Sequence, residues 1–137
     1  MKTLTIILAF LMTLSSPVVG QDFQKGLAAQ YNLAVKYANG TGVARDYKEA
    51  NKLYRLASEQ GLSDAQRNLG FVYARGEGVL QDNTTAHMWF NIAAANGQMF
   101  ASINRDSLAK KMTPAAIEKA QTMARECMSS DYKKCGY

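Results

Sequence analysis

The stretch QYNLAVKYANGTGVARD, residues 30–46, returns 36 positions later as QRNLGFVYARGEGVLQD, residues 66–82. Over the full period, residues 30–65 and 66–101 align without a gap and are identical at thirteen positions. A period of this length is typical of repeat architectures, in which each unit is too small to bury its own apolar face and packs on the next unit. The repeat therefore predicts an array of stacked units.

Apolar residues at spacings of three and four predict that each unit is a pair of helices. In the first unit, one stripe holds Ala29, Leu33 and Tyr37, and the second holds Tyr54 and Ala57. The same spacing recurs in the second unit, and glycines separate the stripes because glycine readily adopts the positive φ at which helices end. The predicted helices cover residues 22–38, 46–60, 63–74, 83–96, 98–110 and 114–128.

Two helix starts carry capping signals. Ser63 followed by Gln66 predicts a capping box, and Thr113 followed by Pro114 predicts an N-cap with proline at the first helical position. Residues 101–128 begin like a third unit and then diverge, as a terminal cap that faces water must.

The first twenty residues have the layout of a secretory signal peptide. Lys2 is their only charge, an apolar run extends from Leu4 to Leu14, and small residues lead to Gly20. The run is shorter than the roughly 20 residues that a membrane span needs. We therefore expect cleavage after Gly20 and a secreted or periplasmic mature chain without a membrane span; a retained signal anchor is the alternative.

The expected fold is all-α: a right-handed α/α solenoid of two helix-pair repeats and a divergent C-terminal helical cap. Its parts are a signal peptide over 1–20, a solenoid over 21–128 and a tail over 129–137. Within the solenoid, repeat 1 covers about 29–64, repeat 2 about 65–100 and the cap 101–128.

Charge and cysteine content narrow the function classes. The chain has 16 basic and 11 acidic side chains, and they are scattered rather than gathered into the basic stripe that nucleic-acid binding requires. We therefore expect no nucleic-acid partner. Cys127 and Cys135 are the only cysteines, and an exported chain favours a disulfide between them, which would tether the tail and contribute about 2–3 kcal/mol. A redox thiol or a metal site is the alternative, disfavoured because there is no C-x-x-C motif and only one histidine.

The run AQRNLGFVYARGEGV, residues 65–79, resembles the opening half of a Sel-one-like repeat, a relative of tetratricopeptide repeats. Residues 82–97 resemble its closing half, and residues 29–61 fit the same repeat. Residues 105–114 resemble the cap of short exported bacterial members. The resemblance implies a solenoid that binds a protein or peptide as an adaptor or regulator. We expect it to act without a cofactor, a metal or catalysis.

In this architecture the first helix of each unit lines the concave face, which places the candidate contact residues there. Asparagines recur at the full period, and their amides can both donate to and accept from an extended peptide; simple helix contacts are the alternative role. Two arginines on the second unit would select an acidic or carboxylate-bearing partner. The candidates are Tyr31, Asn32, Val35, Asn39, Arg67, Asn68, Phe71, Arg75 and Asn104.

Two other functions stay open on the sequence. Ser107 and Lys110 match the S-x-x-K pattern of penicillin-binding enzymes, and some cysteine-rich relatives of the family have been proposed to bind or hydrolyse β-lactams. A self-associating structural module is the third alternative. The sequence further predicts that Trp89 and Phe90 lie in the core and that His87 is a surface or helix-packing residue rather than a metal ligand.

Overall fold

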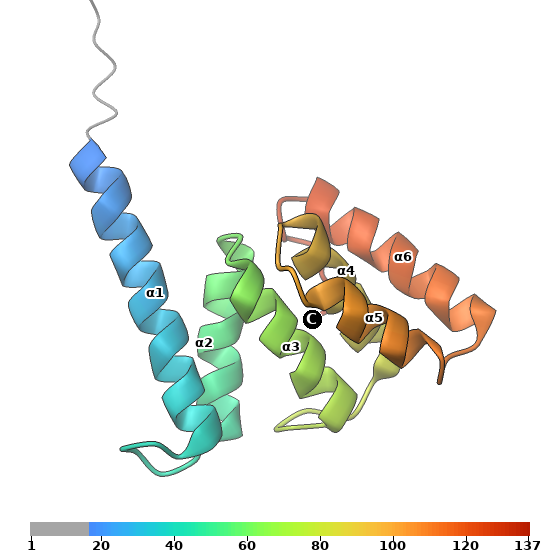
Figure 1. Ribbon diagram of the computed structural model, residues 1–137, viewed down its shortest axis with the longest axis horizontal. Helices are drawn as coiled ribbons and strands as arrows, with labels where there is room; N and C mark the ends of the chain where they lie inside the picture. The colour runs from blue at the N-terminus through green and yellow to red at the C-terminus, as the bar shows by residue number, and fades with distance from the viewer. Residues whose placement is uncertain (1–16) are drawn as a thin grey trace, which may run out of the picture.

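The computed structural model describes residues 17–137, and this part of the chain forms six helices. Figure 1 shows α1 at one edge of the array and α6 at the other. All six predicted helices are present, although α1 begins five residues earlier than predicted and α5 begins three residues later. The helices are α1 (Pro17–Asn39), α2 (Tyr47–Glu59), α3 (Ser63–Arg75), α4 (Asn83–Ala95), α5 (Ala101–Ala109) and α6 (Pro114–Ser129).

The helices pack as stacked pairs, as the repeat predicts. Helix α1 packs on α2 and α3 packs on α4, while α2 also contacts α3 and so joins the two repeats. Helices α5 and α6 both pack on α4 and complete the array. Most of the predicted signal peptide lies outside the described residues, and the predicted cleavage point after Gly20 lies one turn into α1.

Side-chain caps start the second helix of each unit and the last helix. Asp46 Oδ1 accepts a hydrogen bond from the Glu49 backbone N–H at 3.1 Å, and Asp82 accepts from two N–H groups of α4 at 3.0 and 3.1 Å. Thr113 Oγ1 accepts from the Ala116 N–H at 3.1 Å, which confirms the predicted cap of α6. Each such cap stabilises its helix by about 1 kcal/mol.

The predicted capping box at the start of α3 is wrong. Leu62 is the N-cap residue of α3, and it makes no side-chain cap. Gln66 is fully buried instead, and its Nε2 donates to the Ser58 carbonyl at 3.0 Å. Gln66 therefore joins α3 to the end of α2, because a buried amide needs partners that the neighbouring helix supplies.

Glycines end the first helix of each unit, as predicted. Gly76 follows α3 with φ 67°, in the left-handed region that favours glycine. Two residues later, Gly78 passes so close to α2 that an added Cβ would lie 2.9 Å from Tyr47 Cβ. Asn51 on α2 donates to the Glu77 carbonyl at 2.8 Å. The loop after α3 is therefore pinned to α2.

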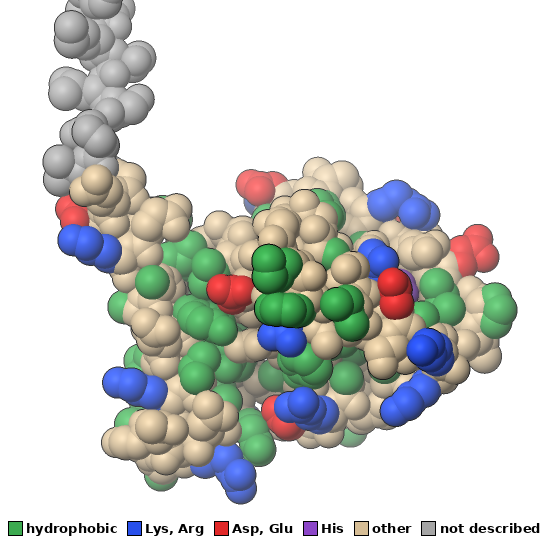
Figure 2. Space-filling view, viewed as in Figure 1, with side chains coloured by type: hydrophobic (Ala, Val, Ile, Leu, Met, Phe, Trp, Pro, Cys, Tyr) green, Lys and Arg blue, Asp and Glu red, His purple; other side chains and the backbone are tan. Residues whose placement is uncertain are grey.

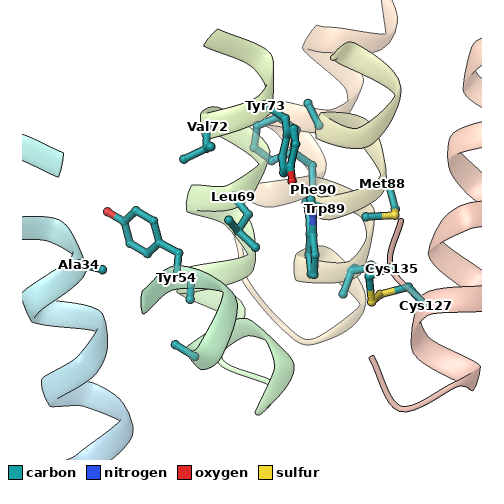
Figure 3. Close-up of a cluster of buried hydrophobic side chains, with 14 of the residues drawn as sticks. Ala34, Tyr54, Leu69, Val72, Tyr73, Met88, Trp89, Phe90, Cys127 and Cys135 are labelled. Carbon is teal, nitrogen blue, oxygen red and sulfur yellow. A yellow bond between two sulfur atoms is a disulfide. The ribbon is translucent and has the colours of Figure 1, made fainter. Parts of the chain in front are cut away.

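The hydrophobic core is elongated, and its buried residues extend from Ala34 on α1 to the disulfide beside α6 (Figure 3). Trp89 and Phe90 lie in it as predicted, with 0% and 2% of their surface exposed. The recurring alanines, such as Ala57 and Ala93, are fully buried and let neighbouring helices approach closely.

Leu33 departs from the expected burial. Leu69, its equivalent in the second repeat, is fully buried, but Leu33 is 40% exposed and Ala29 is also exposed. The reason is the position of α1 at the edge of the array, where no described helix covers its outer side. The apolar stripe that is buried in the second repeat is therefore partly exposed to solvent in the first repeat.

The cysteines form the predicted disulfide, Cys127 to Cys135, and both are buried. The closed loop also brings Tyr132 onto the second repeat. Its hydroxyl accepts hydrogen bonds from Gln66 Nε2 at 3.2 Å and from Asn96 Nδ2 at 2.8 Å. The tail is therefore part of the packed structure.

The last residue packs between the two repeats. The Tyr137 ring stacks on Trp89 with 6.1 Å between ring centroids, and the Arg55 guanidinium lies 4.2 Å from the centre of the Tyr137 ring. The Tyr137 hydroxyl donates to Glu59 Oε1 at 2.8 Å. Burial and this carboxylate partner raise the pKa of Tyr137, so its hydroxyl keeps its proton at neutral pH.

Within residues 17–137, every helix is too short or too polar to cross a bilayer.

We expect Gly70→Ala to destabilise the protein, although alanine is the better helix former. A Cβ at Gly70 would lie 2.4 Å from the Phe90 ring, which is 2% exposed and has little room to move. Overpacking costs about 1–3 kcal/mol and outweighs the gain of about 1 kcal/mol in helix propensity. Urea unfolding should show a net loss of up to about 2 kcal/mol in the free energy of unfolding.

Gly26→Ala is the matched control, since it makes the same change inside α1. An added Cβ there meets nothing within 4 Å, so we expect no loss and a gain of up to about 1 kcal/mol. Equal effects of the two substitutions would show that α3 and α4 are not in close contact at Gly70.

Candidate functional site

The first helices of the units, α1, α3 and α5, form one face of the molecule, which Figure 1 shows in front with α5 drawn over α4. On this face, hydrophobic side chains gather over α3 and α5, with Lys and Arg side chains beside them (Figure 2). Met99, Phe100 and Ile103 at the start of α5 are 74%, 52% and 64% exposed. We call this surface the α1/α3/α5 face.

Two pockets open on the α1/α3/α5 face. The α1–α3 pocket has a volume of about 260 Å³, and the α3–α5 pocket has a volume of about 320 Å³. Of the nine predicted contact residues, the α1–α3 pocket is lined by Tyr31, Val35, Asn39, Asn68, Phe71 and Arg75.

Phe71 and Arg75 line both pockets and separate them. The Phe71 ring meets the Phe90 ring edge-on, with 5.1 Å between centroids and 77° between planes. The Arg67 and Arg75 guanidinium groups lie 5.0 and 4.7 Å from the centre of the Phe71 ring. Both distances are within the range of cation–π attraction, so the aromatic ring holds two positive charges on this face.

The two arginines differ in how available they are. Arg67 Nε donates to Asn104 Oδ1 at 2.7 Å and so ties α3 to α5. Arg75 has a side chain that is 61% exposed and makes a 3.6 Å ion pair with Glu77. An exposed pair of this kind contributes little to stability, so Arg75 can exchange Glu77 for another carboxylate at low cost.

The three period-matched asparagines lie in different surroundings. Asn32 is exposed and lies outside both pockets. Asn68 Nδ2 donates to the Tyr31 hydroxyl at 3.3 Å, and Asn104 accepts from Arg67. Two of the three amides therefore make hydrogen bonds between helices. The Asn68 Oδ1 and the Asn104 Nδ2 remain for a hydrogen bond to a bound peptide.

The tyrosines of the α1–α3 pocket are neutral hydrogen-bonding groups at physiological pH. Burial raises the pKa of Tyr31, and it raises the pKa of Tyr54 to about 12. Their rings lie 6.1 Å apart and form the apolar wall of the pocket. The pocket therefore offers aromatic surface with hydroxyl groups and one guanidinium at its edge.

Several residues that line these pockets are not among the predicted contacts, and Tyr54, Glu77 and Lys111 are the ones that bear on their chemistry. Tyr54 belongs to α2 and was expected only in the core, whereas Glu77 and Lys111 follow α3 and α5. The periodicity of the first helices predicts only which of their own residues face outward. It cannot identify residues of other elements that reach the same face. The charge of Lys111 is a sequence feature, but its place beside Arg75 depends on the packing of α5.

The groups that the enzyme alternative requires are not assembled. Ser107 is exposed and lines the α3–α5 pocket, whereas Lys110 is the C-cap residue of α5 and does not line it. Within residues 17–137, the Ser107 hydroxyl makes no hydrogen bond to the Lys110 ammonium group. An S-x-x-K pair needs such contact for the lysine to activate the serine.

The sequence predicts either a surface or a helix-packing role for His87, and the structure shows the helix-packing role. His87 is 3% exposed on α4, and burial together with the nearby Arg105 charge lowers its pKa. Across the described part of the chain, no three His, Cys, Asp or Glu side chains cluster as metal ligands would.

We expect Arg67 and Asn104 to be energetically coupled, because their hydrogen bond of 2.7 Å joins α3 to α5. A double-mutant cycle with Arg67→Ala and Asn104→Ala should give a coupling of about 0.5–1.5 kcal/mol in urea unfolding. Asn32→Ala is the matched control, and its effect should add to that of Arg67→Ala. A coupling near zero for Arg67 and Asn104 would show that Arg67 is free on the surface.

Comparisons with solved structures give the same architecture. The chain is similar to the crystal structure of c5321, a protective antigen present in uropathogenic Escherichia coli strains displaying an SLR fold, with 34% identity and a TM-score of 0.73 over 77% of this chain. It is also similar to a Sel1 repeat protein from Oxalobacter formigenes, with 29% identity and a TM-score of 0.58 over 74% of this chain.

The match covers only 24% of the Escherichia coli chain and 48% of the Oxalobacter chain. No curated protein matches the sequence. The Sel1 repeat model matches residues 27–62 and 63–98, more than half of the chain and both of the helix pairs α1–α2 and α3–α4. The protein therefore belongs to the Sel1 repeat family, with two such repeats in an SLR fold.

Proposed function

We propose that the protein binds a peptide segment of a partner protein along the α1/α3/α5 face and has no catalytic activity. The observation that carries this proposal is the pair of adjoining pockets that share Phe71 and Arg75. The SLR fold generally mediates protein interactions, and family members are usually non-catalytic although some are β-lactamases. Both facts agree with a binding role.

The chemistry of the two pockets differs and defines the preferred segment. The α1–α3 pocket has the Tyr31 and Tyr54 rings and Val35, and so suits an apolar side chain. The α3–α5 pocket has Arg75 and Lys111 together with the amide of Asn104, and so suits a carboxylate. The expected partner therefore presents an apolar and an acidic residue close together.

The exposed apolar residues around the start of α5 extend this surface. Met99, Phe100 and Ile103 are all more than half exposed, and Arg67 lies 5.7 Å from the Phe100 ring centre. Exposed apolar groups that adjoin pockets are typical of protein-binding surfaces. We assign them to the rim of the same binding surface.

We further infer that the protein acts outside the cytoplasm, in the envelope or as a secreted protein. The buried Cys127–Cys135 disulfide supports this location, because such bonds persist in oxidising compartments. The leader-like layout of residues 1–20 supports it independently. One of the similar structures is a protective antigen present in uropathogenic Escherichia coli strains.

The partner chemistry can be tested by selecting binders from a random peptide library on the purified protein. We expect enriched peptides to combine acidic and apolar residues and to bind Arg75→Glu at least tenfold more weakly, because the variant repels the carboxylate. Affinities would be measured by isothermal titration calorimetry. Arg75 is largely exposed, so the variant should keep its helical circular dichroism.

Arg125→Glu is the matched control, since it makes the same charge change on the exposed surface of α6. It should leave the affinity for the selected peptides unchanged. If both variants weakened peptide binding equally, the effect would come from the net charge of the protein and not from the position of Arg75. Full binding by Arg75→Glu would overturn the assignment of the α1/α3/α5 face.

The location can be tested by mass spectrometry of the protein produced from its full sequence in a bacterial host. We expect an extracytoplasmic species that lacks residues 1–20 and weighs two hydrogen atoms less than its reduced form, because export permits the disulfide. A species that retains Met1 and has two free thiols would contradict the proposal.

A further inference from the structure

A third pocket lies outside the α1/α3/α5 face and shares no residue with the two pockets described above. It has a volume of about 450 Å³, within the usual range for small-ligand sites. One wall is α2, the second is the pinned loop at Gly78 and Val79, and the third is the Tyr137 ring. We call it the α2 pocket.

The α2 pocket has an excess of positive charge. Lys48, Lys52 and Arg55 line it along one side of α2, and none of them forms an ion pair within residues 17–137. Glu59 is the one acidic residue among those that line it, and it already accepts the Tyr137 hydroxyl. The guanidinium of Arg55 is held in place, since its Nη2 donates to the Tyr73 hydroxyl at 3.0 Å and its face stacks on Tyr137.

A buried acceptor in the same wall has no partner. Asn51 is 95% buried and lines the pocket; its Nδ2 binds the loop carbonyl at 2.8 Å, but its Oδ1 has no hydrogen-bond partner in the described structure. The Arg55 Nε also has none. Unpaired buried polar atoms destabilise a purely structural element.

The second repeat shows that this arrangement is not required by the fold. The positions 36 residues after Lys48, Asn51 and Lys52 hold Thr84, His87 and Met88. There the corresponding side of α4 is closed, and Met88 is fully buried beside α6. The two lysines and the open pocket therefore belong to the first repeat alone.

We propose that the α2 pocket binds the carboxyl-terminal residue of a peptide. The carboxylate lies between the Lys48 and Lys52 ammonium groups, with the Arg55 charge beside it. An aliphatic side chain next to that carboxylate packs on Leu56 and Val79. A peptide end has a carboxylate and an aliphatic side chain within one residue, which matches the wall of cations and the apolar patch.

The site can be tested with N-acetyl-alanyl-leucine as the probe, titrated into the purified protein by calorimetry. Trp89, the only tryptophan of the chain, gives a local signal because its ring stacks on Tyr137, which walls the pocket. We expect saturable binding with a dissociation constant of roughly 1 mM or below and a change in Trp89 emission. The amidated form of the same peptide should bind about tenfold more weakly because it lacks the charge.

The variant Lys48→Gln with Lys52→Gln should weaken binding of the free acid about tenfold, and both residues are exposed, so the fold should persist. Lys25→Gln with Lys36→Gln on α1 is the matched control and should bind as the parent does. Binding that Lys48→Gln with Lys52→Gln keeps and that Arg75→Glu loses would place the probe at the α1/α3/α5 face and overturn its assignment to the α2 pocket, so the two sites are distinguishable.

Three results would overturn the proposal: no binding of the free acid at about 5 mM, equal binding of acid and amide, or undiminished binding by the Lys48 and Lys52 variant. Inorganic phosphate forms a separate arm of the titration. If phosphate binds as tightly as the peptide and displaces it, the pocket is a general anion site and the peptide assignment is wrong.

Discussion

The contact of the Phe90 ring with the backbone of Gly70 sets how closely α3 approaches α4, and much else follows from it. Any side chain at Gly70 would occupy the position of the ring. Because Phe90 lies there, Phe71 on the next residue of α3 meets it edge-on at the surface. Phe71 in turn holds Arg67 and Arg75 on the α1/α3/α5 face. One glycine in the core thus determines where two surface charges lie.

Helix α4 is enclosed by the rest of the molecule, which explains why the cap and tail are needed. Residues 85–90 are all buried, because α3, α5 and α6 pack on this helix and Tyr137 covers Trp89. The disulfide holds the loop from which Tyr132 reaches Gln66 and Asn96. In a short array, the tail therefore closes apolar surface that a further repeat would otherwise bury.

The two surfaces with pockets have different origins in the repeat. The α1/α3/α5 face is built from the same positions of successive units, and its asparagines recur at the 36-residue period, whereas its aromatic residues Tyr31 and Phe71 do not. The α2 pocket arises where the period is broken, because Lys48 and Lys52 have no equivalents in the second unit and α2 is not covered as α4 is. The repeated positions form the two adjoining pockets, and the positions that depart from the repeat form the separate α2 pocket with its three cations.

The sequence by itself determined the helix pairs, their glycine ends, the buried Trp89 and Phe90, and the disulfide. It also pointed to the first helices of the units, which carry many of the residues that line the pockets of the α1/α3/α5 face. These features depend on local spacing and on residue chemistry, which a repeat displays twice. Only the tertiary structure decided that Leu33 is exposed, that Gln66 bridges helices rather than capping one, that Arg67 is held by Asn104, and that Tyr137 lies between Arg55 and Trp89. Each of these depends on which helix or tail segment covers a residue, and that partner lies up to 82 positions away in the chain, a distance at which local periodicity carries no information.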